Sequence, residues 1–223
     1  MQPTYLPWAG YFNLILNTDV FVFLDDVQYE KNSWQNRNRI LINKAYHWIT
    51  VPVSINRLDT KICEVKIVVD QPWRKKNMSM IRHTYLKCPY FDSIEAILSI
   101  IGDESIKLLY ELNEKIIKTI ATSLGLNPLF ISSRELGING QRTERLLKIC
   151  NHFSCTKYLS PEGSKEYLTE DGLFEQQSSV ELVFQDFIPK KYDQKDTQNF
   201  FSHLSIIDVL ANLGIDGTKK YLE

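Results

Sequence analysis

The stretch VFVFLDD at residues 20–26 decides the fold class of this chain. Its five apolar residues are too few for a helix, are rich in types that favour strands, and are typical of a strand buried on both faces. Strand patterns at 129–132, 157–159 and 180–185 alternate with helical patterns. This alternation predicts an α/β layer built on a mostly parallel sheet.

An antiparallel hairpin and a helical cap complete the predicted fold. Residues 36–42 and 46–53 are expected to be strands paired across a short turn, and residues 62–69 a further strand. The helical patterns within 73–124 are expected to form the cap. Helices are predicted at 10–17, 73–86, 93–101, 105–124, 141–153 and 204–213.

The chain has 223 residues, and we expect one domain, 1–223, of a cytoplasmic protein. Its 26 basic and 27 acidic residues nearly balance, so no global field favours nucleic acid or an anionic membrane. No apolar run approaches the roughly 20 residues that cross a bilayer, and MQPTYLPWAG lacks the pattern of a signal peptide. The four cysteines form no C-x-x-C pair, so we expect reduced thiols and no metal site.

A loop rich in proline and aromatic residues, MQPTYLPWAGY, opens the chain at residues 1–11. Gly10 would let a ligand approach the backbone just before a helix, whose first N–H groups suit a phosphate or carboxylate. Tyr5, Trp8 and Tyr11 offer flat faces on which a base or sugar could stack, and Gln2 belongs to the same predicted substrate site. The alternative is a rigid turn with aromatic residues in the core.

Two aspartates, Asp25 and Asp26, follow the buried strand at 20–24 directly. Ligands of open α/β sheets bind at the carboxyl ends of the strands, so both are candidate catalytic residues, with Gln28 as a substrate-binding neighbour. They could hold a ribose hydroxyl, an amine or a metal, or one could act as a base. The alternative is that one of them caps the next segment.

The segment WQNRNR at residues 34–39 combines hydrogen-bonding capacity with almost no apolar residues. On a strand, Asn36 and Asn38 face one way and Arg37 and Arg39 the other. We expect one pair to line the pocket, beside Trp34, and the arginines could clamp a phosphate or carboxylate. A solvated strand face is the alternative.

A loop and a histidine are the remaining candidates. The Pro-Glu-Gly-Ser turn after the strand at 157–159 could hold a second anionic or hydroxyl group. His83, on a predicted helix, is a candidate general acid or base, although an arbitrary histidine is more often structural. G-x-S-x-G, P-loop and G-x-G-x-x-G motifs are absent from the sequence, which argues against the common hydrolase, kinase and dinucleotide-binding classes. The predicted binding residues of the loop are Ser160, Gly163, Ser164 and Tyr167.

Together these motifs resemble the WbqC-like family. The resemblance rests on MQPTYLPWAGYF, DVFVFLDDVQYEKNSWQNRNRI, WITVPV, GQRTERLLKIC, KYLSPEGSKEY and LSIIDVLANLG, and covers nearly the whole chain. Family members often carry a first strand before the MQP element, and here that strand is expected to be short or missing. The resemblance implies a role in O-antigen and other surface-polysaccharide synthesis, through acyl or aminoacyl transfer to an amino sugar.

A weaker resemblance concerns the fold. A Pro-bearing loop followed by Gly10-Tyr11 at the start of a helix is similar to the H-x-G-H region of nucleotidyltransferases with a Rossmann-like fold of the HUP type. Tyr11 stands where the second histidine would be, so that pair is not available to stabilise a transition state.

The preferred expectation is a transferase that acts on a nucleotide-linked amino sugar with an acyl or aminoacyl donor. Here the N-terminal aromatic residues stack the substrate, Arg37 or Arg39 holds phosphate or carboxylate, and Asp25 or Asp26 serves the accepting amine. Alternatives are a non-catalytic sugar-nucleotide binding protein of a polysaccharide assembly complex and a nucleotidyltransferase-like enzyme. All the clusters are expected to meet in one concave pocket, while cofactor and oligomeric state stay open.

Overall fold

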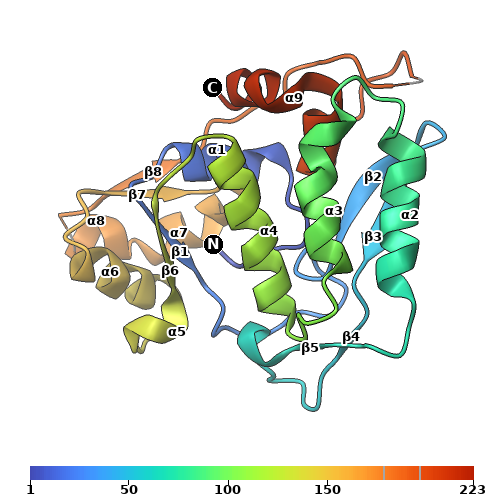
Figure 1. The fold of residues 1–223 in the computed structure, drawn as a ribbon. Coiled ribbons are helices and arrows are strands. Elements are labelled where there is room, and N and C mark those ends of the chain that lie inside the picture. Colours follow the sequence, from blue (N-terminus) through green and yellow to red (C-terminus); the bar gives the residue numbers. More distant parts are fainter. Residues whose placement is uncertain (178, 196) are drawn as a thin grey trace.

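The computed structural model describes residues 1–177, 179–195 and 197–223, which form a mixed α/β fold (Figure 1). The predicted α/β class is confirmed. The helices are α1 (Ala9–Leu16), α2 (Trp73–Tyr85), α3 (Glu95–Gly102), α4 (Leu109–Ser123), α5 (Ser133–Leu136), α6 (Arg142–His152), α7 (Lys165–Asp171), α8 (Leu173–Gln177) and α9 (Ile206–Leu222), with 3-10 turns η1 (Ile62–Glu64), η2 (Phe91–Ile94) and η3 (Glu162–Ser164).

The strands pair two by two. Parallel pairs join β1 to β6 and β7 to β8, and antiparallel pairs join β2 to β3 and β4 to β5. The predicted single, mostly parallel sheet is therefore divided into small sheets. On the far side of β1 from β6, the α-amino group of Met1 donates to Val22 O and Leu24 N donates to Met1 O, each at 2.8 Å. The strands are β1 (Val20–Phe23), β2 (Arg37–Ile42), β3 (Ala45–Thr50), β4 (Val53–Ser54), β5 (Lys66–Ile67), β6 (Leu129–Ser132), β7 (Lys157–Ser160) and β8 (Glu181–Phe184).

The strand predicted at 62–69 is largely wrong. The segment forms η1 and then only the two-residue strand β5. Ile62 and Val65 are both buried, and a spacing of three residues brings them to one side of a helical turn, whereas a strand would turn them to opposite faces. Glu64 closes the turn, because its carboxylate accepts a hydrogen bond from the backbone N–H of Lys61 at 3.2 Å.

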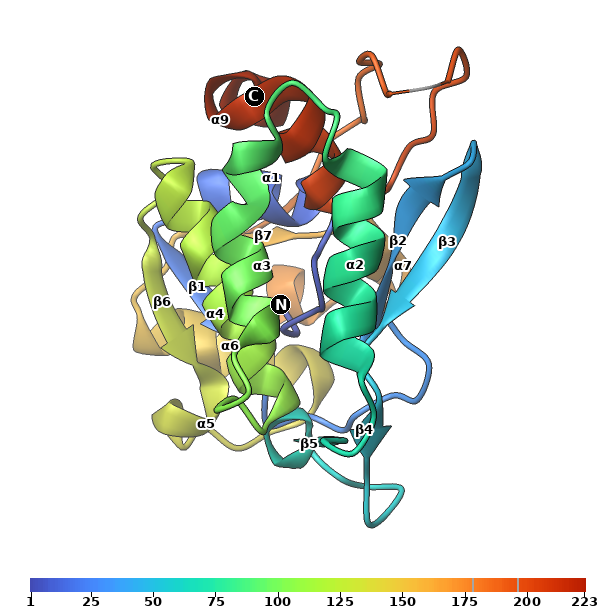
Figure 2. The ribbon, with the colours of Figure 1, turned by 45° about the vertical axis from the view of Figure 1, so that its right-hand side comes forward.

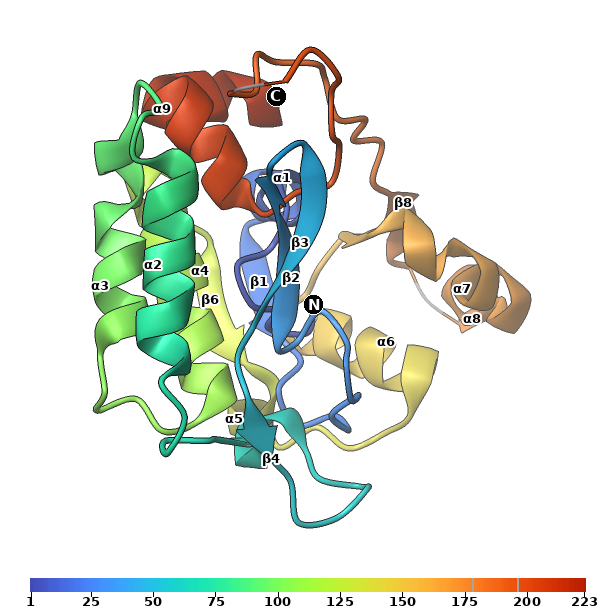
Figure 3. The same ribbon diagram turned by 90° about the vertical axis from the view of Figure 1, so that its right-hand side faces the viewer.

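The main core lies between the helices and the inner face of the β2–β3 hairpin. Helices α2, α3 and α4 stand side by side as a layer (Figure 1), and α9 crosses one end of it (Figure 2). Buried apolar residues of α1, α2, α3, α4 and α9 belong to one cluster. A second, smaller cluster joins α6, α7 and α8 to β7 and β8, which lie to one side of the hairpin in Figure 3.

Helix α9 differs from the predicted helix at 204–213. It bends at Gly214, whose φ is +70°, and continues to Leu222. A Cβ at this glycine would lie 2.7 Å from the ring of Tyr90. Glycine therefore ends the regular helix directly after residue 213, the last residue of the predicted range, but allows the chain to resume a helical course beneath an aromatic ring.

Candidate active site

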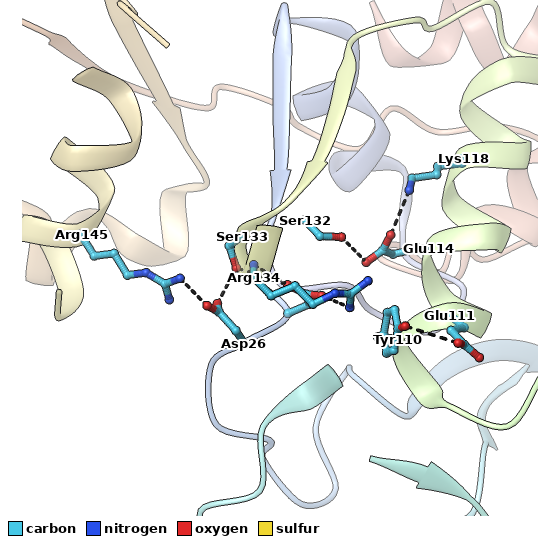
Figure 4. Close-up of polar contacts among 10 residues, drawn as sticks. Asp26, Tyr110, Glu111, Glu114, Lys118, Ser132, Ser133, Arg134 and Arg145 are labelled. Carbon is cyan, nitrogen blue, oxygen red and sulfur yellow. Dashed lines mark hydrogen bonds and ion pairs between the residues drawn. The ribbon is translucent and has the colours of Figure 1, made fainter. Parts of the chain in front are cut away.

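The parallel pairing of β1 with β6 brings two polar segments to one edge of this small sheet. In the register of the pair, Phe23 lies opposite Ser132. The residues that leave the two strands, Asp25 and Asp26 from one and Ser133 from the other, therefore emerge beside each other. Ligands of α/β proteins bind at such carboxyl ends. Figure 4 shows the polar contacts of this edge with α4 and α6.

Asp25 is completely buried and is held by the first turn of α5. Its Oδ1 accepts hydrogen bonds from Ser133 Oγ and from the backbone N–H of Arg134, each at 3.3 Å. Its Oδ2 forms an ion pair with the guanidinium of Arg134, which lies 4.0 Å from the centre of the Tyr110 ring. Burial raises the pKa of Asp25 above its ordinary value, although the charge and backbone N–H of Arg134 act in the opposite direction.

Asp26 keeps contact with solvent, its side chain being 18% exposed. It accepts a short hydrogen bond from Ser133 Oγ and pairs with Arg145 Nη2 of α6 at 2.6 Å. Burial acts to raise the pKa of Asp26, but the hydrogen bonds from Arg145 and Ser133 outweigh it and hold that pKa below its ordinary value. Asp26 is therefore ionised at neutral pH.

Ser133 connects the two carboxylates. Its single hydroxyl proton can be donated to Asp25 or to Asp26, and the contact with Asp26 is the shorter one. Titratable neighbours whose environments separate their pKa values are typical of acid–base sites. The arrangement can hold a cationic group at Asp26 and pass a proton through the hydroxyl toward Asp25.

Glu114 of α4 fixes the end of β6 beside this cluster. Its carboxylate accepts a hydrogen bond from Ser132 Oγ at 3.2 Å and pairs with Lys118 at 2.9 Å. The ammonium of Lys118 also lies 5.2 Å from the centre of the Phe23 ring. Both strands of the parallel pair are thus tied to one helix.

Sequence reasoning misses Ser133, Arg134 and Arg145. The first two directly follow the predicted strand at 129–132, so the rule that singles out the aspartates after β1 would have found them after β6. Arg145 comes from the helix predicted at 141–153, and no local pattern ties it to Asp26.

The outer face of the hairpin carries an arginine–aromatic ladder, formed by Trp34, Arg37, Arg39, Tyr46 and Trp48. The guanidinium of Arg37 lies 4.1 Å from the Trp48 ring centre, and that of Arg39 lies 4.6 Å from Tyr46 and 5.3 Å from Trp34. The Trp34 and Trp48 rings are 5.3 Å apart. The alternation predicted for residues 36–39 is confirmed, with both arginines on one side of β2.

The inner face of β2 carries the two asparagines, and both are buried. Asn38 Nδ2 donates to the backbone oxygens of Tyr5 and Leu6 at 3.1 and 2.8 Å. Asn36 Nδ2 donates to Val51 O at 3.0 Å. These amides hold backbone in place instead of lining a pocket, which corrects their expected role in substrate binding.

The N-terminal aromatic wall is not formed as predicted, because Tyr5 and Tyr11 are buried in the core. Tyr5 Oη accepts a hydrogen bond from Asn77 at 3.3 Å. Tyr11 Oη donates to Gln2 O at 3.0 Å. The rigid turn with core aromatic residues, the alternative interpretation, describes both tyrosines.

Trp8 and Gly10 pack against each other. A Cβ at Gly10 would lie 2.1 Å from the Trp8 ring, so this glycine makes room for the indole and not for a ligand. The indole in turn packs on His203 and Phe187, with ring centres 4.7 and 5.7 Å away.

Two glutamines predicted to bind substrate contact other parts of the chain. Gln2 Oε1 accepts a hydrogen bond from Gln35 Nε2 at 2.8 Å, which ties the N-terminal loop to the segment before β2. Gln28 is exposed and donates to Leu58 O at 2.9 Å. Gln2 thus lies between the aspartate edge and the hairpin, because Met1 lies alongside β1.

The predicted loop after β7 forms η3 and the start of α7. Ser160 is buried, and its backbone oxygen accepts a hydrogen bond from Gln185 N at 2.8 Å. Gly163 is exposed within η3, Ser164 precedes α7, and Tyr167 is exposed on α7. This loop belongs to the smaller lobe built on the β7–β8 pair.

His83 lies elsewhere, in a cleft of about 350 Å³ that it lines with Lys44 and Asp208 among others. Neither aspartate of the β1 edge and neither arginine of the ladder lines this cleft. The predicted residues therefore occupy separate places, and the expectation that they meet in one concave pocket is wrong.

The described residues contain neither a cluster of metal ligands nor a membrane-spanning helix. No group of three histidine, cysteine or acidic side chains lies close enough together there to hold a metal ion. No helix in the same ranges is long and apolar enough to cross a membrane.

Comparison with known proteins identifies relatives along almost the whole chain. The model of the WbqC-like protein family matches residues 2–220. The chain is 31% identical over 218 residues to the uncharacterized protein Rv1507c of Mycobacterium tuberculosis, covering 97% of this chain and 93% of that protein. No solved structure matches. The chain therefore belongs to the WbqC-like protein family.

Proposed function

We propose that this protein is a transferase of surface-polysaccharide sugar synthesis, including that of O-antigen. It moves an acyl or aminoacyl group to the amine of a nucleotide-linked amino sugar in the cytoplasm. The pathway follows from the resemblance of its motifs to those of the WbqC-like family. The chemistry of the edge formed by β1 and β6 supports the proposed reaction.

One observation carries the proposal: Ser133 Oγ contacts both Asp25 and Asp26 where two parallel strands end. An amino sugar is a cation at neutral pH, and the ionised, partly exposed Asp26 suits its ammonium group. To accept one acyl group, the ammonium must lose two protons in all, the first of them before the nitrogen can attack. Asp25, whose pKa burial raises, is the better proton acceptor of the pair.

The proton route that we propose runs through Ser133. Asp26 orients the ammonium and takes its proton, the serine hydroxyl passes a proton on, and Asp25 receives it. The freed amine then attacks the acyl carbonyl, the donor's leaving group departs with the electron pair of the broken bond, and that leaving group takes up the second proton that the nitrogen loses. Asp25 has no exposed surface, so it acts only through the serine.

We also propose a Rossmann-like arrangement of the HUP type for the sheet regions. Two features support it: both β1–β6 and β7–β8 are parallel pairs, and helices α7 and α8 connect the strands of the second pair. In such folds, substrates lie across the carboxyl ends of the strands.

A second function, non-catalytic binding of sugar nucleotides, is favoured by a different observation. Both aspartates already have an arginine partner, and Arg145 is only 12% exposed. Two carboxylates that are each paired with an arginine can hold α5 and α6 on the sheet without taking part in a reaction.

Product formation separates the two functions. The purified protein is incubated with a nucleotide-linked amino sugar and an acyl or aminoacyl donor, and mass spectrometry measures the product. We expect the wild type to form amide and Asp26→Asn to lose most of its turnover while remaining folded. Asp59→Asn is the matched control, because Asp59 is exposed and pairs only with exposed Arg57 in the described part of the chain. Turnover by Asp26→Asn equal to that of the control overturns the proposed role of Asp26. Binding of the sugar nucleotide without any turnover favours the second function.

A further inference from the structure

Two arginines on the outer face of the hairpin have no counter-charge within residues 1–177, 179–195 and 197–223. Arg37 and Arg39 take part in no ion pair with the described residues. Among the residues that the structure describes, the Nε of each is buried without a hydrogen-bond partner, and the contact of Arg39 Nη2 with His203 O is a long one, 3.4 Å. Alternate residues of a strand are roughly 7 Å apart. Two half-buried cations therefore lie side by side, and an anion between them would satisfy donors that burial has stripped of water.

Tyr29 adds a third unsatisfied group. Its side chain is buried, and its hydroxyl has no hydrogen-bond partner in the described part of the chain. Burial raises the pKa of this hydroxyl, and the positive charge of Arg37 acts against the rise, which places Tyr29 within the field of that arginine. A buried polar group without a partner is uncommon in a native fold, and this one lies close enough to Arg37 for the charge of that arginine to act on it.

The aromatic residues of the ladder are exposed although they are large and apolar. Trp34, Tyr46 and Trp48 are 46%, 43% and 45% exposed. Exposed aromatic residues beside unpaired arginines indicate a binding surface more than a packing defect. Their flat faces suit a planar ring, and the arginines suit phosphate oxygens.

We infer that the ladder binds the diphosphate and base of a nucleoside diphosphate. The arginine pair holds the diphosphate, and the indole of Trp34 or Trp48 stacks on the base. This inference deepens the proposed function, since it names the part of the substrate that carries the sugar, and it rests on that function only for the sugar's destination.

The size and charge of the ladder favour a single nucleotide over a longer partner. A nucleic acid strand needs a track of positive charges, whereas the ladder has two arginines in a chain of net charge −1. A neutral sugar would use the aromatic faces but would leave both guanidinium groups unsatisfied. A nucleoside diphosphate matches both features.

The ladder also connects to the aspartate edge. Gln35, two residues before Arg37, donates to Gln2 Oε1 at 2.8 Å. Gln2 follows Met1, which lies along β1 just before the aspartates. These contacts join the segment that precedes the ladder to the strand that ends at the aspartates.

Titration of the intact protein with uridine, cytidine, guanosine and thymidine diphosphates tests the inference. Binding is followed by calorimetry and by quenching of tryptophan fluorescence. We expect saturable binding of at least one nucleoside diphosphate, weaker binding of the matching nucleoside and of inorganic pyrophosphate, and a loss of at least tenfold in affinity in Arg37→Gln/Arg39→Gln. Arg57→Gln, at an exposed arginine outside the ladder, should bind as the wild type does.

Several outcomes overturn the inference. Absence of saturable binding, or equal affinity in the double variant and the control, removes the arginines from the site. Pyrophosphate binding as tight as that of the nucleotides removes the stacking contact. Tighter binding of a single-stranded oligonucleotide makes the surface a nucleic-acid site. A dimer in light scattering that Trp48→Ala dissociates makes it a contact between copies. Binding is measured without an acyl or aminoacyl donor. The result of this test therefore does not depend on whether the proposed transfer reaction occurs.

Discussion

Both faces of strand β2 carry side chains that form hydrogen bonds, but the two faces serve different purposes. On the inner face, Asn38 gives both of its N–H donors to backbone carbonyl groups of the N-terminal loop. On the outer face, Arg37 and Arg39 stack on aromatic rings and pair with no described carboxylate. The comparison teaches that a polar run in a sequence does not identify a site by itself. Polar groups whose hydrogen bonds go to the backbone stabilise the fold. Polar groups whose hydrogen-bonding capacity is left over can bind a ligand.

The largest effect that this comparison predicts is on the inner face. Asn38→Ala should lower the free energy of unfolding by about 3 kcal/mol, because two buried carbonyl groups lose their donors. Urea unfolding measures the change, and Asn139→Ala at an exposed position is the control. A loss for Asn38→Ala no greater than that of the control would mean that the inner face does not hold the loop.

The two aspartates that follow β1 allow a second comparison, between a partly exposed carboxylate and a buried one. Asp26→Asn should lower the free energy of unfolding by about 2 kcal/mol at pH 7, since the charged partner of Arg145 is lost. Asp25→Asn should cost less, because burial already disfavours its ionised form. Equilibrium unfolding of the two variants checks the order, and the reverse order contradicts it.

The pH dependence of stability should differ in sign between the same residues. The lowered pKa of Asp26 means that its contribution is present above the ordinary aspartate pKa, about 3.9, and is lost as the pH falls through the lowered value. The raised pKa of Asp25 means that stability is lost as the pH rises from 3.9 through the raised value. Urea midpoints between pH 2 and 7 should show a weaker acid loss in Asp26→Asn than in the wild type. A parallel pair of curves would rule out this role of Asp26.

The smallest effect on stability is expected on the outer face. Arg37→Gln/Arg39→Gln should change the free energy of unfolding by about 1 kcal/mol or less, because the variant loses cation–π contacts at a surface and one long, exposed hydrogen bond to His203 O. Thermal and urea unfolding of this variant measure the change. A loss as large as that of Asn38→Ala would show that the outer face is structural and would remove the contrast.

Much of the fold could be predicted from local patterns. The buried strand at 20–24, the hairpin, and the two aspartates at a strand end follow from periodicity and from the chemistry of strand ends. The partners of those aspartates could not, because Arg145 reaches Asp26 across 119 positions of the chain. Long-range pairs of this kind depend on how helices pack, which a single sequence does not encode locally.

In the N-terminal loop, the sequence predicts a binding site that the structure does not form. Its tyrosines and Gly10 resemble a ligand site in composition, yet the tyrosines fill the core and the glycine accommodates Trp8. Composition cannot distinguish a core from a ligand site, since aromatic side chains suit both a core and a stacking surface. Trp48 and Tyr46, by contrast, become candidates only when the register of the hairpin places them beside the arginines.

Hydrogen–deuterium exchange with and without uridine diphosphate, or whichever nucleoside diphosphate binds, tests the central contrast most directly. If the outer face of the hairpin is the open one, the ligand should slow exchange in residues 34–39 and 45–50 and leave exchange unchanged in residues 80–85, which line the cleft around His83 and Asp208. Protection centred on that cleft, or exchange that the nucleotide does not alter in the hairpin, would contradict the account.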